Sequence, residues 1–359
     1  MEIIEQHSKN ITAILPIYNV VEYLELAVSS LVNQTAEKVE VILVDDGSTD
    51  GSAELADKLA LQYEQVMVIH QKNSGAAEAR NNGIKLATGK YLYFMDPDDW
   101  AKPDMLREMY DAAEKYSAQL VMTGFTNKYD DGRIQNETAV IPEFAVYSNK
   151  KQFRESAHIY LNNTMLAVPW NKLYLKSYIT ENNLEFPSVK WDDLHFNIEA
   201  VKEIDRVVVV PNKDYQFLRT RPGSETTKVF DSSLFDKRKQ QYEHVLDVFN
   251  YWALNSTRTS KALNYYFAGR TFQIVQEISD NPQFSYLEKK NMIKKIVNDP
   301  LVERTLSGDM DGSLLIRMAI LPLKKKQILL SLGSGKFVSI IKNRFGKTFN
   351  NVRVRLMKV

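Results

Sequence analysis

Short apolar runs alternate with helix-period segments through the first hundred residues, and this alternation constrains the fold more than any other feature of the chain. Strand followed by helix, repeated several times, is typical of a mostly parallel sheet whose faces are covered by helices. We therefore predict an α/β fold. The predicted elements, strand and helix in turn, are 11–15, 21–34, 39–44, 52–63, 66–69, 76–87 and 91–95.

A polar cluster follows each of the four predicted strands. Ligands of such sheets bind beyond the carboxyl ends of the strands, so these clusters are expected along one edge, in one cleft. The cleft would contain an aromatic ring, several carboxylates, an amide and glycine turns. The clusters are Pro16-Ile17-Tyr18-Asn19, the segment 45–51 (DDGSTDG), the segment 71–75 (QKNSG) and Asp96-Pro97-Asp98-Asp99.

The pair Asp96 and Asp98, separated by one proline, suits a divalent cation. Two hard oxygen ligands this close together fit Mg²⁺ or Mn²⁺, with phosphates and water completing the shell. A turn fits the same residues, because Asp and Pro are common turn formers and Asp98 or Asp99 could cap the next helix. The residues alone leave both interpretations open.

The loop after the second strand contains Asp45 and Asp46, either of which could accept a hydrogen bond from a nucleobase or a ribose. Helix capping by Ser48 or Asp50 is the alternative. The loop after the first strand has no glycine, and a Walker loop is absent, so neither a dinucleotide fold nor a P-loop is predicted. Phosphates would be held by metal and side chains.

Composition limits the class of protein. The chain has 359 residues, with 44% hydrophobic and 25% charged content, which indicates a globular protein of one large or two ordinary domains. Because there is no cysteine, disulfides, thiolate metal sites and cysteine nucleophiles are excluded, and a reducing compartment is favoured. The N-terminus does not resemble a signal peptide, and no apolar run reaches membrane-spanning length. A cytoplasmic location is expected.

Five motifs occur in order along the chain: PIYN, VDDGSTDGS, NSGAAEARNNGI, ATGKYLYFMDPDDW and WDDLHF. Together they resemble the family 2 glycosyltransferases, inverting enzymes of the GT-A fold, over about residues 9–225. We predict a GT-A catalytic domain over 1–228, a helical extension over 229–311 and a basic amphipathic tail over 312–359. The resemblance implies a nucleotide-sugar donor, usually a UDP-sugar, and a divalent cation, Mg²⁺ or Mn²⁺.

The resemblance also assigns residues to the donor. Pro16 and Tyr18 match positions that frame the base, and Asp46 matches the carboxylate that accepts from the uracil N–H. Asn73 and Arg80 match polar positions around the nucleotide and its diphosphate, although Arg80 could equally be a surface residue.

The cation and the phosphates have their own matched residues. Asp98 would contact the cation, and Asp96 the ribose or a water bound to the cation. Arg221 and Ser224, in the segment that closes the catalytic domain of this family, are candidate phosphate contacts.

Inverting transfer needs one carboxylate to take the proton from the acceptor hydroxyl. Asp193 matches the family position for this base, although the family more often has Glu-Asp where this chain has Asp192-Asp193. The alternative is that both carboxylates only stabilise a helix N-terminus. Trp170, in a segment that resembles the acceptor side of the family, could also simply be core.

The C-terminal segment differs in charge from the rest of the chain. Eleven of the 46 basic residues, and none of the 45 acidic ones, follow Asp311, so the first 311 residues carry a net charge of −10. Apolar turns with lysines between them fit an in-plane helix at an anionic membrane. Packing on the protein's own body, a homo-oligomer contact or an anionic polymer such as a teichoic acid fits as well. Nucleic acid is not expected, because aromatic and basic residues are not interleaved.

The resulting expectation is a metal-dependent hexosyl- or N-acetylhexosaminyltransferase. It would move a sugar from a UDP-sugar to a hydroxyl of a cell-surface glycan precursor, either a lipid-linked oligosaccharide or a wall polymer, in the cytoplasm or on the inner face of the membrane. A nucleotidyltransferase is disfavoured because Asp193 would have no task. A catalytically inactive adaptor with this fold, binding a membrane or an anionic polymer, is the alternative outside enzymes.

Overall fold

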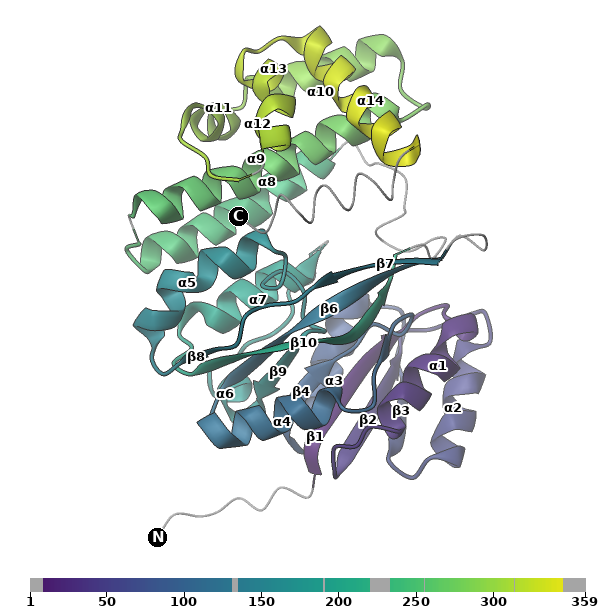
Figure 1. Cartoon of the computed structure of the whole chain (residues 1–359). Coiled ribbons are helices and arrows are strands. Elements are labelled where there is room, and N and C mark those ends of the chain that lie inside the picture. Colours follow the sequence, from purple (N-terminus) through teal and green to yellow (C-terminus); the bar gives the residue numbers. More distant parts are fainter. Residues whose placement is uncertain are drawn as a thin grey trace. The chain divides into compact units, whose positions relative to one another are not determined.

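The computed structural model describes residues 9–130, 135–189, 191–219, 233–254, 256–312 and 314–344. The chain divides into two compact units, one made of residues 1–157 and 163–227 and the other of residues 158–162 and 228–359. The first unit contains a ten-stranded sheet with flanking helices, and the second is helical (Figure 1).

The alternation predicted for the first hundred residues is confirmed, with every predicted element present. In chain order the elements are β1 (Lys9–Ile17), α1 (Val21–Val32), β2 (Val39–Asp45), α2 (Ser52–Gln62), β3 (Val66–His70), α3 (Ala76–Leu86), β4 (Gly89–Phe94), β5 (Trp100–Ala101), α4 (Met105–Tyr116), β6 (Leu120–Asp130), β7 (Gln135–Val140), β8 (Ala145–Tyr147), α5 (Lys150–Asn162), β9 (Lys172–Leu175), α6 (Lys176–Glu181), α7 (Asp192–Lys202) and β10 (Val207–Leu218).

The sheet has a parallel half and a mixed half. Its order is β3-β2-β1-β4-β9-β6-β10-β5, with β7 paired to β6 and β8 paired to β10. Strands β3, β2, β1 and β4 are parallel to one another. Strand β9 is antiparallel to both of its neighbours, β4 and β6, whereas β10 is parallel to β6. The strands of the mixed half, β9, β6, β10 and β5, lie beyond the residues for which elements were predicted.

The strand order reverses at β1. The chain passes from β1 to β2 and β3 in one direction and then returns to place β4 on the other side of β1. Right-handed crossovers therefore place α1 and α2 on one face and α3, which packs on β1 and β2, on the other. The carboxyl ends of β1 and β4 border the crevice where ligands of such sheets bind.

Gly89 opens β4 directly against β1. A Cβ at this position would lie 2.6 Å from Thr12 N and 2.7 Å from Ile11 C, which are backbone atoms of the neighbouring strand. Gly89→Ala should therefore lower the free energy of unfolding by about 1–3 kcal/mol, as overpacking does in cores. Urea denaturation measures this loss. Gly269→Ala in α9 (Thr257–Asp280), where a Cβ meets nothing within 4 Å, is the control and should not destabilise. Equal losses in the two variants would contradict the packing argument.

The second unit is built around α9, against which α8, α10, α11 and α14 pack. Ser285 and Glu288 form a capping box at the start of α10, and the Asp299 carboxylate accepts from the first N–H groups of α11.

Among the helices of the described residues, none combines the length and the apolar character that a membrane span requires. The helices are α8 (Leu234–Tyr251), α9 (Thr257–Asp280), α10 (Tyr286–Val297), α11 (Pro300–Ser307), α12 (Leu314–Ala319), α13 (Leu321–Lys324) and α14 (Ile328–Arg344).

Candidate active site

Polar side chains of the loop after β2 hold the start of α1. Ser52 Oγ accepts from Val20 N at 2.8 Å, and Asp50 Oδ2 accepts from Val21 N at 3.1 Å. Because the first N–H groups of a helix lack partners within it, these contacts fix the loop after β1 against the loop after β2. Asp50 Oδ1 also accepts from Ser52 N, the first residue of α2, at 3.0 Å, so the capping interpretation of Asp50 is confirmed and this carboxylate holds the first turns of both α1 and α2. Tyr18, on this joined surface, is 49% exposed, so its ring can be reached from solvent.

Asp46 holds the loop that leads into α3. Its Oδ1 accepts from Ser74 N at 2.7 Å and from Gln71 Nε2 at 2.8 Å, and its Oδ2 accepts from Gly75 N at 2.8 Å. The carboxylate is buried, and an ionised carboxylate offers about four acceptor positions, so these three donors fill most of its capacity. This anchoring role was not anticipated from the sequence. Recognition of a uracil by Asp46 stays a prediction.

His70, at the end of β3, bridges two carboxylates. Its Nδ1 lies 3.0 Å from Asp45 Oδ2 and its Nε2 lies 3.0 Å from Asp57 Oδ1. These hydrogen bonds, first that with Asp45 and then that with Asp57, raise the pKa of His70 above its ordinary value.

A pH dependence of stability follows from the raised pKa of His70. The stabilisation is fully present below the unfolded pKa of about 6.5 and is lost as pH rises through the higher folded value. Because the ring is half exposed, the effect should stay below about 1 kcal/mol. Urea denaturation between about pH 6 and 9 should show wild type losing stability relative to His70→Gln. Parallel pH profiles for the two proteins would contradict this assignment.

The three carboxylates after β4 go to different partners. Asp99 is buried, where it accepts from Tyr215 Oη at 2.5 Å and from Leu218 N at 2.7 Å, so it fastens this turn to β10. Asp96 pairs with Arg80, whose Nη2 lies 3.1 Å from Asp96 Oδ1. Asp98, which lies between them in the sequence, is half-buried. Neither Asp98 nor Asp99 begins the next helix, because α4 starts at Met105 after Asp104.

Arg80 gathers carboxylates from three parts of the chain. Besides Asp96, its Nη1 lies 3.0 Å from Asp192 Oδ2 and 3.2 Å from Asp193 Oδ1. The guanidinium lies over the ring of Phe186, 5.1 Å from its centroid, and is buried. Arg80 is therefore not a surface residue. We call Arg80, Asp96, Asp192 and Asp193 the arginine cluster.

One guanidinium does not balance the negative charge of the cluster. Although burial opposes ionisation, the Asp193, Asp192 and Asp96 carboxylates raise the pKa of Arg80. Burial, opposed by Arg80, raises the pKa of Asp96 to about 6 and that of Asp193 to about 8. Within the described part of the chain, the buried atoms Arg80 Nε, Tyr93 Oη and Asp193 Oδ1 have no hydrogen-bond partner. Three carboxylates therefore share one guanidinium, and the site is short of positive charge.

Asp193 lies in the first turn of α7. The helix begins at Asp192, directly after Trp191 in the left-handed conformation, so both carboxylates lie at a helix N-terminus, as the alternative interpretation requires. It does not exclude a role as base. The Asp193 side chain is 30% exposed while its Oδ1 is buried beside Arg80, so the exposed fraction belongs to the rest of the side chain.

The strand β9 and the segment before it form a buried support next to Asp193. Lys172, fully buried, donates from Nζ to Met165 O at 2.5 Å, to Asn171 Oδ1 at 2.8 Å and to Val168 O. Burial lowers the pKa of Lys172, and nearby Asp193 opposes this shift. The three acceptors match the three N–H donors of an ammonium group.

Two further buried side chains support the site, and the second of them was missed in the sequence. Trp170 is core, as its alternative interpretation held, and stacks on Tyr215 with centroids 4.2 Å apart. Next to Arg80, the amide of Asn81 donates to Phe186 O at 2.9 Å and accepts from Phe186 N at 2.8 Å. The sequence gives no signal for the hydrogen bonds between Asn81 and Phe186, because the two residues are 105 positions apart.

Besides Asp46 and Asp98, which lie in the loops after β2 and β4, the predicted residues fall into three groups in the structure. Arg80, Asp96 and Asp193 meet in the arginine cluster. Pro16 is buried within β1, whereas Tyr18 and Asn73 are exposed beside the loops after β1 and β3. Arg221 and Ser224 lie outside the described residues.

The residues present fit a divalent cation only as a partial shell. In the described ranges, no group of three or more His, Cys, Asp or Glu side chains could hold a metal ion. Mg²⁺ is commonly held by one or two carboxylates together with substrate phosphates and water, and Asp96 and Asp98 offer that number of ligands. The negative excess around Arg80 suits a cation as well.

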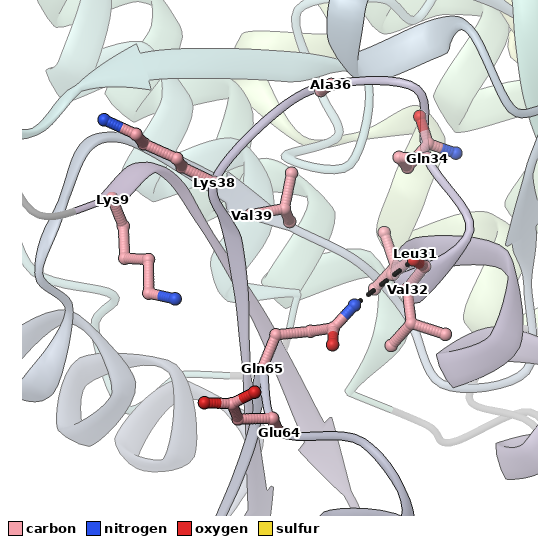
Figure 2. A pocket seen from close by; sticks show the side chains of 9 residues that line it. All are labelled: Lys9, Leu31, Val32, Gln34, Ala36, Lys38, Val39, Glu64 and Gln65. Atoms are coloured by element: carbon pink, nitrogen blue, oxygen red, sulfur yellow. Dashed lines mark hydrogen bonds between the residues drawn. The ribbon is translucent and has the colours of Figure 1, made fainter.

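A separate cavity of about 310 Å³ lies at the opposite end of the sheet (Figure 2). It is lined by residues at the amino ends of β1, β2 and β3, among them Lys9, Lys38 and Gln65. Gln65 Nε2 donates to Val32 O across it at 3.2 Å. None of the predicted site residues lines this cavity.

Comparison with known proteins agrees with this arrangement. A family model described as glycosyl transferase family 2 matches residues 12–181. The uncharacterized glycosyltransferase EpsJ of Bacillus subtilis is 28% identical over 82% of this chain and 86% of that protein. The glycosyltransferase GlyG of Streptococcus pneumoniae is 31% identical over 63% of this chain and 76% of GlyG.

A solved structure shows the same fold over most of the chain. TarS 1–349 of S. aureus, in complex with UDP-GlcNAc, superposes with a TM-score of 0.63 at 19% identity, covering 94% of this chain and 92% of that one. The GT-A fold predicted from the motifs is confirmed by this likeness. With the sheet, the ordered motifs and the relatives in agreement, the chain belongs to glycosyl transferase family 2.

Proposed function

We propose that this protein transfers a sugar from a UDP-sugar, with inversion, to a hydroxyl of a cell-surface glycan precursor. The arginine cluster carries the proposal, because it places the Asp-x-Asp carboxylate Asp96 and the base candidate Asp193 on one guanidinium. Donor-side and acceptor-side groups of a displacement reaction must be this close. That TarS was solved with UDP-GlcNAc supports a UDP-sugar as the donor.

The donor would bind across the carboxyl ends of β1, β2 and β4. The exposed ring of Tyr18 offers a stacking surface for the base, and Asn73 is exposed on the loop that Asp46 holds. Asp98 and Asp96 would hold Mg²⁺ or Mn²⁺. The cation, when bound, supplies Lewis-acid stabilisation of the leaving diphosphate.

Asp193 would take the proton from the acceptor hydroxyl as the hydroxyl oxygen attacks the anomeric carbon. Its raised pKa suits this task, since a base works best when its pKa lies near the working pH. Arg80 would hold the carboxylates of Asp193 and Asp96 in fixed positions relative to each other. Asp192 would pair with the same guanidinium. The acceptor approaches from the exposed side of Asp193.

Calorimetric titration tests the donor assignment. The protein is titrated with UDP-, GDP- and dTDP-sugars, with and without Mn²⁺, alongside Asp98→Ala and the control Asp111→Ala on the exposed surface of α4. We expect metal-dependent binding of a UDP-sugar by wild type and control, and its loss in Asp98→Ala. If no nucleotide binds to any of the three proteins, the donor assignment is wrong and the inactive adaptor takes its place.

A further inference from the structure

Helix α14 packs on its own unit through small side chains. Ser331, Gly335 and Ser339 recur every four residues and are buried. A Cβ at Gly335 would lie 2.7 Å from Ser279 Oγ on α9, and Ser339 donates to Asp280 at the end of the same helix. The close approach of α14 to α9 therefore uses the face that carries the least apolar surface.

Four large apolar side chains of α14 are exposed instead. Leu329, Leu330, Phe337 and Ile340 are 48% to 63% exposed. This is the reverse of an ordinary surface helix, whose apolar stripe faces the core. The two short helices that precede α14 continue the pattern. Their exposed apolar residues are Leu314, Met318 and Leu321.

Basic residues border this apolar surface. Arg317, Lys324, Lys325 and Lys336 are exposed, and Lys326 pairs with Glu303 at 3.0 Å. No Asp or Glu occurs from residue 312 to the end of the chain. We call the exposed apolar and basic residues of α12, α13 and α14 the C-terminal face.

We propose that the C-terminal face docks in the plane of an anionic lipid bilayer. Large apolar side chains exposed together, with lysines beside them, are what an in-plane helix needs to enter the headgroup boundary and attract anionic lipids. A second copy of the chain is a poorer occupant, because a symmetric contact would bring like-charged lysines together. An anionic bilayer both covers the apolar side chains and neutralises the lysines.

Vesicle flotation of the full chain tests the proposal. The protein is mixed with phosphatidylcholine vesicles or with vesicles that also contain phosphatidylglycerol. The apolar variant is Leu330→Ser/Phe337→Ser, with Leu61→Ser, a 91% exposed leucine on α2, as control. The charge variant is Lys324→Glu/Lys325→Glu, with Lys58→Glu/Lys151→Glu as the control of equal net charge. Circular dichroism confirms that each variant is folded.

We expect binding only to the anionic vesicles, weakened roughly tenfold or more in the charge variant and unchanged in its control. The apolar variant should lose a comparable share of its binding to the anionic vesicles. Raising the salt concentration from about 0.1 M to about 1 M should weaken binding, because the electrostatic screening length shortens from about 10 Å to about 3 Å.

Three results would overturn the proposal: absence of binding to anionic vesicles, equal losses in variants and controls, or a wild-type dimer in sedimentation that the apolar variant abolishes. Donor binding, measured in parallel, is independent of all three. Failure here therefore leaves the proposed transfer activity untouched, and loss of donor binding leaves the membrane result intact.

Discussion

Asp193→Asn should lower kcat for sugar transfer by roughly 10²–10⁴-fold, the usual contribution of a positioned general base. Asparagine keeps the shape of the side chain but cannot take a proton. Because the change removes a charge and no volume, the donor should still bind. A radiolabelled transfer assay measures the rate, and calorimetry of the same preparation measures donor affinity. Asp192→Asn, which removes the neighbouring carboxylate from the same Arg80, is the matched control and should cost far less activity.

The pH profile gives the same experiment a second readout. The base must be ionised, so kcat/KM of the wild type should rise with pH through the pKa of Asp193, about 8. This rise of kcat/KM with pH should be absent from the residual activity of Asp193→Asn. Unchanged transfer by Asp193→Asn would refute the base assignment. An unchanged pH dependence of kcat/KM in this variant would mean that the ionising group is not Asp193.

Arg80→Met should be among the most destabilising single substitutions in the chain, lowering the free energy of unfolding by about 3–5 kcal/mol at neutral pH, as removal of one partner from a buried ion pair does. It leaves Asp96, Asp192 and Asp193 without their shared cation. Arg80→Lys should recover only part of the loss, because a single ammonium cannot reproduce the planar fork that meets all three. Urea denaturation measures both variants.

The loss should shrink at lower pH. Without Arg80 the folded pKa values of the three carboxylates lie above the unfolded value of about 3.9, so their ionisation opposes folding at pH 7. As pH falls from the folded values towards the unfolded value of about 3.9, the carboxylates become neutral in the unfolded chain as well and the penalty is relieved. Arg107→Met on the exposed surface of α4, where Arg107 pairs with Asp104 and Asp111, should cost at most about 1 kcal/mol. Equal losses for Arg80→Met and Arg107→Met would mean that the cluster is not held by charge.

Local pattern was enough to predict the parallel half of the sheet. Its strands are short apolar runs. The crossovers after β1 and β2 each bring the next strand beside the one before it, and the crossover after β3 returns the chain to place β4 beside β1. The mixed half depends on pairings such as β9 with β4, which join residues far apart in sequence and which no periodicity reports. For the same reason, the pattern did not place β9 between β4 and β6.

The candidate site shows the same division. The motifs located Arg80, Asp96 and Asp193, but their convergence on one guanidinium needed the fold. Asp99 carries no signal that separates it from Asp98, because its partners Tyr215 and Leu218 lie on β10. Charge and turn propensity are properties of a residue and its neighbours, whereas burial and partner choice belong to the assembled molecule.

The long sequence separation within the arginine cluster has a consequence for synthesis on the ribosome. Arg80 and Asp96 are 16 residues apart, but Arg80 and Asp192 are 112 residues apart. At about 5–20 residues per second, Arg80 and Asp96 leave the ribosome several seconds or more before Asp192 and Asp193 can join them. The nascent parallel half can form its strands during that interval, yet the arginine cluster is completed only after α7 has emerged.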